Sequence, residues 1–286
     1  MENTAHPKRK SFDLASCSRP RTVEVKTPRV SALIPSSEAV PAPSNEVVNK
    51  LGTAKLLMGF DIETNDFLDG RKPYCVGRFG HGCWCHHGDL QFRLVQLGWF
   101  TCFAESDIDV KARKERLVIP DGYDISQKAT NKHGITTEHA AQHGLAIPQV
   151  LEEFMSTAWS VHEAGGVLVS HHLEFDSGII DEELKRCHLE AWRPRWQTMA
   201  SQGICTLDLD IQEWLQTSFG KPQTAGEKTL VMSLKDSIRL FYANDANVRS
   251  LLQKAHTAAA DAELHAMLLH ALRGLAKRAS SSSAQS

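Results

Sequence analysis

The sequence lacks the features that would place it in a membrane or in a disulfide scaffold. No apolar run approaches the ~18 residues that a transmembrane helix needs, and no apolar signal core stands near the N-terminus. Seven cysteines in 286 residues are few and odd in number, which is not the pattern of a secreted disulfide framework. We therefore expect an intracellular protein, nuclear or cytoplasmic and not secreted, with reduced thiols and no membrane partner.

The sequence also lacks an excess of either charge. Lys and Arg total 32 and Asp and Glu total 34, so the net charge is −2. This balance excludes a strongly basic nucleic-acid coat protein, although it leaves room for a local basic groove. The hydrophobic share of 42% and the charged share of 23% are ordinary for a globular chain, and the length allows one large domain or two small ones.

The two ends of the chain differ in composition from its middle. Residues 1–50 hold six of the eleven prolines, no glycine and one aromatic residue, and they carry eight basic against five acidic side chains. We expect residues 1–50 to be a disordered basic arm, because so little apolar surface cannot offset the entropy of ordering. Within it, Lys8-Arg9-Lys10 is either a nuclear-import signal or a solvated basic cluster. Residues 276–286 end in a serine-rich stretch and are predicted to be a disordered tail, which leaves residues 51–275 as one domain.

The middle of the chain alternates predicted strands and helices. Short apolar or β-rich runs predict strands at residues 56–60, 92–103, 116–119 and 167–169. Helical spacing of apolar residues predicts helices at residues 148–161, 174–187, 233–242 and 257–275. Strands first, then strands alternating with helices, indicate an α/β fold with a mixed central sheet flanked by helices.

The first acidic motif, Asp61-Ile62-Glu63-Thr64, follows the first predicted strand. Side chains alternate along a strand, so Asp61 and Glu63 point to the same side. Two adjacent carboxylates repel each other, and a hard divalent cation relieves that repulsion through oxygen ligands. Taken alone, the motif fits either a metal site or an ordinary strand end that faces water.

Two further acidic motifs stand at predicted helix starts. In the segment from His171 to Asp176, the aspartate falls in the first helical turn, where an acid also favours the helix dipole. In His256-Thr257-Ala258-Ala259-Ala260-Asp261, a spacing of five does not align on one helix face. We therefore expect His256 on the loop and Asp261 inside the helix. Each motif alone also fits a structural histidine or a capped helix start.

In combination and in this order, the three motifs resemble the DEDDh branch of the DnaQ-like 3′–5′ exonucleases, within the ribonuclease-H-like superfamily. The resemblance extends over residues 55–275. It includes an HGIT-like segment, a DTL-like segment, a helix before the last motif, and an HxAxxDAE-like segment, which lie at residues 131–136, 206–209, 233–236 and 256–263.

The resemblance implies a ribonuclease-H-like fold and a phosphodiester hydrolase that releases nucleoside 5′-monophosphates from a free 3′ end. It implies two divalent ions, Mg²⁺ or Mn²⁺, and His256 as the general base of a two-metal mechanism. The implied metal ligands, which also count as catalytic residues, are Asp61, Glu63, Asp176 and Asp261.

The positions that the resemblance implies for substrate contacts match the family pattern only in part. Thr64 matches it, Phe67 is placed to contact the terminal base, and His133 belongs to the HGIT-like segment. His172 stands where many relatives have asparagine, and it retains a donor for the substrate. We therefore assign Thr64, Phe67, His133 and His172 as candidate substrate-binding residues.

The resemblance implies single-stranded DNA or RNA with a free 3′ end as the substrate, and three related functions fit the same motifs. They are an RNA-specific trimming nuclease of the oligoribonuclease type, a catalytically silent nucleic-acid-binding module, and a proofreading partner of a polymerase or another protein in trans. The silent module is the least favoured, because all four carboxylates and His256 are present.

Two other features have alternative interpretations. A cysteine- and histidine-rich insert at about residues 66–90 is either a structural zinc site or a glycine-rich loop with reduced thiols. Its irregular spacing favours the loop, without a tightly bound metal. The Arg193-Pro194-Arg195-Trp196 segment either grips a nucleic-acid strand or anchors a surface helix.

Overall fold

A five-stranded mixed sheet forms the centre of the molecule. The computed structural model describes residues 40–66, 75–76, 82–83, 92–103, 113–220 and 231–283. The strand order is β5-β4-β1-β6-β7; β1 pairs antiparallel with β4 and parallel with β6, β5 runs antiparallel to β4, and β7 runs parallel to β6. The strands are β1 (Leu56–Thr64), β4 (Leu94–Phe103), β5 (Arg113–Leu117), β6 (Val167–Ser170) and β7 (Ile204–Cys205). A separate two-stranded pair is formed by β2 (Cys75–Val76) and β3 (Gly82–Cys83).

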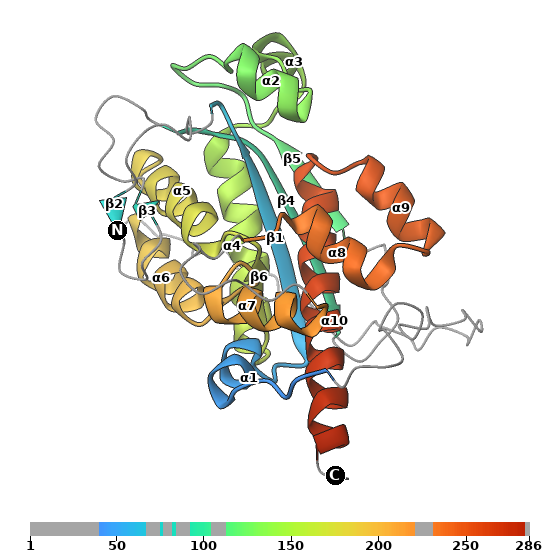
Figure 1. Cartoon of the computed structure of the whole chain (residues 1–286). Helices are drawn as coiled ribbons and strands as arrows, with labels where there is room; N and C mark the ends of the chain where they lie inside the picture. Colours follow the sequence, from blue (N-terminus) through green and yellow to red (C-terminus); the bar gives the residue numbers. More distant parts are fainter. Residues whose placement is uncertain are drawn as a thin grey trace, which may run out of the picture.

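Helices cover both faces of the sheet (Figure 1). The helices are α1 (Asn45–Leu51), α2 (Gln127–His133), α3 (Thr137–His143), α4 (Ile147–Glu163), α5 (Leu173–Arg186), α6 (Arg193–Ser201), α7 (Leu209–Ser218), α8 (Leu234–Tyr242), α9 (Ala246–Gln253) and α10 (Ala258–Ser283). Among the described residues, no helix has an apolar stretch long enough to cross a lipid bilayer.

Two apolar layers hold the helices to the sheet. On one face, side chains of α4, α5 and α6 pack on β1 and β4, and rings of Phe60, Phe154 and Trp196 meet with centroids 5.7 Å apart. On the other face, α10 lies along β1 and β4 together with α1, α7 and α8. Burial on both faces explains why β1 is apolar from Leu57 to Phe60 without alternation.

The first turns of α10 approach the sheet through glycine. A Cβ atom placed on Gly59 would lie 2.0 Å from the Ala262 carbonyl oxygen, and one on Gly98 would lie 2.1 Å from the Ala258 carbonyl carbon. No side chain fits in either gap, so both strand positions require glycine. This contact fixes how close the start of α10 comes to the middle of β1.

The ordered domain extends beyond both predicted boundaries. The expected arm of residues 1–50 includes most of α1, whose N-cap Ser44 accepts from the Val47 amide and whose Val47 and Leu51 are buried. The expected tail of residues 276–286 is helical up to Ser283, with Ala279 buried. Tertiary packing of α1 and of the end of α10 supplies order that the composition of these segments alone does not indicate. Residues 1–39, including Lys8-Arg9-Lys10, lie outside the described residues.

Candidate active site

β1 carries the first two acidic side chains toward α10. We had predicted that the acidic motif follows this strand. The strand instead extends to Thr64, so the motif lies within β1. Gly59 faces the backbone of α10, and Asp61 and Glu63 follow it at intervals of two, which places them on the same side of the sheet. Glu63 is 5% exposed, and Asp61 is also largely buried.

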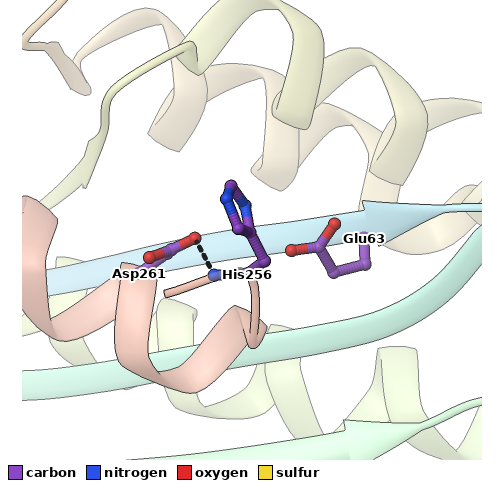
Figure 2. Close-up of side chains that lie close together, drawn as sticks. All are labelled: Glu63, His256 and Asp261. Atoms are coloured by element: carbon purple, nitrogen blue, oxygen red, sulfur yellow. Dashed lines mark hydrogen bonds between the residues drawn. The ribbon is translucent and has the colours of Figure 1, made fainter. Parts of the chain in front are cut away.

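The loop before α10 brings His256 and Asp261 together. As predicted, His256 lies on the loop and Asp261 in the first turns of the helix. The His256 amide donates to Asp261 Oδ2 over 3.0 Å, and His256 has a φ of +78°. A non-glycine residue in this left-handed region is strained, and such strain persists where surrounding structure enforces it. Figure 2 shows Asp261 and Glu63 on either side of His256.

The second acidic motif supplies Asp176 from the adjacent strand and helix. β6 runs parallel to β1, and α5 starts just beyond its end, which places Asp176 near the carboxylates of β1. Asp176 is 4% exposed, and the Ser170 hydroxyl donates to its Oδ2. We call Asp61, Glu63, Asp176 and Asp261 the acidic cluster.

The members of the acidic cluster oppose each other's ionisation. Burial, followed by the charges of Asp176, Asp261 and Glu63, raises the pKa of Asp61 well above its usual value. Burial likewise raises the pKa of Glu63, Asp176 and Asp261. Lys132, at the end of α2, acts in the opposite direction on all four carboxylates. Full ionisation of the cluster is therefore disfavoured unless positive charge compensates it.

The chemistry and the geometry of the acidic cluster fit a divalent cation. Glu63, His256 and Asp261 each offer a ligand atom within 4.8 Å of the others. Asp261 Oδ1 is buried and has no hydrogen-bond partner among the described residues. A buried carboxylate oxygen without a partner is costly unless a cation occupies its lone pairs. Hard oxygen ligands of this kind suit Mg²⁺ or Mn²⁺.

The start of α10 is held by side chains from the sheet. Gln96 Oε1 accepts from the Ala258 amide over 2.9 Å, and Glu115 Oε2 accepts from the Ala259 amide over 3.2 Å. The first amides of a helix have no partner within the helix, so β4 and β5 provide the cap. These contacts set the position of Asp261 relative to β1.

One residue of the site was missed by sequence reasoning. His265 lies one helical turn after Asp261, is fully buried, and places Nε2 3.8 Å from Asp61 Oδ1. Its Nδ1 lies 2.9 Å from the Phe60 carbonyl oxygen, and burial lowers its pKa. The spacing of four from Asp261 was the available signal, but a histidine in an apolar helix is more often a core residue. It supports the side chain of Asp61.

The candidate substrate residues divide into two groups. Thr64 is buried and its hydroxyl donates to the Asp66 carbonyl oxygen, while both ring nitrogens of His133 contact backbone groups. These two side chains hold the strand end and α2 in place. His172 is exposed at the start of α5, against the ring of Phe175. Phe67 lies outside the described residues.

The other sequence features have structural roles or lie outside the described part. His171 is bonded through both ring nitrogens, to Thr206 Oγ1 and to the Met232 carbonyl oxygen. Trp196 is buried in the core, and Arg193 pairs with Asp181 at 2.7 Å, so the tryptophan–arginine segment anchors α6. The side chains of the cysteine- and histidine-rich insert after Asp66 lie outside the described residues.

Comparisons with known proteins show similarity in structure alone. No protein-family profile and no curated protein sequence matches the chain. Among solved structures, it is similar to a zinc-bound E. coli exonuclease I–single-stranded DNA complex (14% identity, TM-score 0.51, 80% of this chain and 42% of the other). It is also similar to a product-bound exonuclease I (13%, 0.52, 78% and 44%) and to E. coli exonuclease I with a dA16 oligonucleotide (14%, 0.50, 79% and 42%).

The similarity confirms the predicted fold class. The mixed five-stranded sheet with its helices matches the ribonuclease-H-like fold of exonuclease I. The chain spans less than half the length of those exonuclease I chains. With identity at this level, the fold is shared, and the function must be argued from the site.

Proposed function

We propose that this protein is a metal-dependent 3′–5′ exonuclease, which shortens single-stranded nucleic acid from a free 3′ end and releases nucleoside 5′-monophosphates. One observation carries the proposal. Four carboxylates from three separate chain segments converge beside His256, although Asp176 and Asp261 both raise the pKa of Asp61 and of Glu63. Buried carboxylates with strongly raised pKa values cluster at sites that bind cations or carry out reactions.

Each residue has a chemical task in this proposal. Divalent cations held by the acidic cluster would neutralise the scissile phosphate and the oxygen that leaves. His256 accepts the proton of the attacking water, because its imidazole lies beside the cluster on a fixed loop. Burial and the charges of Lys132 and Lys235 lower its pKa, which keeps the ring neutral and able to accept a proton at neutral pH.

The test is the cleavage pattern of a 5′-labelled single strand, made as DNA and as RNA, with Mg²⁺, with Mn²⁺ and with a chelator. We expect stepwise shortening that the chelator stops. Asp61→Ala, Asp176→Ala and Asp261→Ala should abolish it, since each removes an anionic ligand. His256→Ala should retain cation binding, while the rate falls by ~10²–10⁴-fold, the usual contribution of a positioned acid–base group.

Two matched controls separate the site from general surface effects. Glu213→Ala removes an exposed carboxylate on α7, and His270→Ala removes an exposed histidine on α10; both should leave the ladder unchanged. Internal cleavage by the wild type, or shortening that persists in Asp61→Ala, would refute the proposal. The RNA arm decides between a general exonuclease and an RNA-trimming enzyme, because ribose recognition depends on contacts to the 2′-hydroxyl.

A further inference from the structure

A basic groove lies next to His256, between α8, α9 and the loop that leads into α10. Its volume is about 690 Å³, within the size range of clefts that hold small ligands. Figure 1 shows α8 and α9 beside the upper part of α10, on the opposite side of that helix from α5 and α6. The residues that line the groove are Lys235, Arg239, Ala243, Arg249, Leu252, Gln253, Ala255 and His256.

The groove has a strong excess of positive charge. Three of its eight lining residues are Lys235, Arg239 and Arg249, and none is acidic. Arg239 pairs with Asp236 at 3.0 Å, but both side chains are more than half exposed, and such pairs are weak. In the described part of the chain, neither Lys235 nor Arg249 is within salt-bridge distance of a carboxylate. This groove contrasts with the net charge of −2 of the whole chain.

The lining also indicates what kind of contact the groove makes. No aromatic side chain other than the His256 ring lines it, so bases have little surface on which to stack. Arginine and lysine side chains suit phosphate oxygens, which carry no sequence information. The expected ligand is therefore a chain of phosphates and not a particular base.

We propose that this groove binds the sugar–phosphate backbone of the nucleic-acid strand on the 5′ side of the bond that is cut. This inference rests on the proposed exonuclease function. In an exonuclease, only the terminal nucleotide lies on the 3′ side of that bond, so any further phosphates must leave the site in the 5′ direction. His256 is one of the residues that line the groove, so the groove adjoins the proposed general base and offers positive charge to those phosphates.

Direct binding tests the groove without cleavage. The probe is a 5′-fluorescein single-stranded DNA 12-mer, measured by anisotropy with Asp61→Asn protein, so that the strand stays intact. We expect Arg249→Gln and Arg239→Gln each to weaken binding at least ~3-fold. Each should also lower the slope of log affinity against log salt by ~0.7, the value for one phosphate contact on a single strand.

Lys277→Gln is the matched control, because it removes an exposed cation near the distant end of α10. It should change neither affinity nor salt slope, and unfolding temperatures of all variants should agree. Equal affinity of the Arg249→Gln/Arg239→Gln double variant and the control would overturn the inference. An acidic peptide 12-mer that competes as well as DNA, with the same loss in the double variant, would also overturn it in favour of a protein ligand.

Turnover separates this inference from the proposed function. In otherwise wild-type protein, the double variant should lose at least ~5-fold more kcat/KM on a 12-mer than on a dinucleotide, because the dinucleotide has no phosphates to place in the groove. Loss of 12-mer binding without turnover by the wild type would support the groove and refute the exonuclease. Normal turnover with equal losses on both lengths would refute the groove alone.

Discussion

The contact between Gly98 and the first turn of α10 provides the sharpest test of how this fold builds its site. In Gly98→Ala, the new Cβ would lie 2.1 Å from the Ala258 carbonyl carbon and 2.2 Å from the Ala259 amide nitrogen. Ordinary contacts begin at 3.4 Å, so the helix start must move by about 1.3 Å, the difference between 3.4 and 2.1. Backbone atoms on both sides leave no flexible side chain to absorb that displacement.

The magnitude follows from what the displacement breaks. The two hydrogen bonds to Gln96 and Glu115 that cap α10 would be lost, at about 0.5–1.5 kcal/mol each. Overpacking adds about 1–3 kcal/mol. The sum is roughly 2–6 kcal/mol, which corresponds to a fall in unfolding temperature of about 5–15 °C. The same movement carries Asp261 away from β1, and a misplacement of about 1 Å can lower a rate by ~10²-fold.

The assay compares thermal unfolding and exonuclease rate in Gly98→Ala and Gly274→Ala. Gly274 lies on the same helix, where a new Cβ would meet only the Arg278 guanidinium, at 3.8 Å. Gly274→Ala should stabilise the protein by about 0.5–1 kcal/mol, because alanine is the better helix former. If Gly98→Ala unfolds within about 1 °C of the wild type, the backbone contact described above does not exist in solution.

Three further predictions concern the cluster, the N-terminus and the insert. Burial raises the pKa of Asp261 from 3.8 to about 6 and that of Glu63 from 4.5 to about 8, so the folded protein holds more protons than the unfolded chain between those values. Metal-free protein should therefore lose roughly 5–10 °C in unfolding temperature as the pH rises from about 4 to about 8; Mg²⁺ should restore it in the wild type but not in Asp61→Asn. Removal of residues 1–39 should leave the unfolding temperature unchanged, whereas removal of residues 1–50 should lower it, since α1 packs on α7 and α10. Elemental analysis should find no tightly bound zinc, and an equivalent that disappears in Cys83→Ser/Cys85→Ser would contradict this.

The order of elements could be predicted because strands and helices leave local signals in the sequence. Apolar runs of strand length and helical spacing are visible in the sequence, and the positions of His256 and Asp261 on loop and helix follow from their spacing. The first strand was predicted to end at Phe60, before the acidic motif, whereas β1 includes that motif. Its strand continues through Thr64 because pairing with β4 continues to Leu94, a contact that only the sheet reveals.

The remaining features depend on long-range contacts. His133 matches a family segment in sequence, yet its ring contacts the Ile135 amide and the Thr64 carbonyl, and no local pattern indicates that orientation. α1 was not predicted because its stability depends on tertiary contacts: Val47 and Leu51 are buried, and Lys50 pairs with Asp208 and Asp210 at the start of α7. Short helices of this kind are marginal without such tertiary contacts.

The small residues between His256 and Asp261 connect the fold to the proposed chemistry. Ala258 and Ala259 carry only methyl groups, so the first turn of α10 lies directly on Gly98. This approach brings Asp261 into the field of the carboxylates on β1, at a cost that the apolar packing along α10 must offset. A larger side chain at this contact should therefore weaken both the stability of the protein and its cation binding. Removing a single carboxylate should weaken cation binding while raising the stability of the metal-free protein, since it relieves the repulsion. Opposite signs in the two classes of variant would show that the cluster is maintained for its ligand and not for the fold.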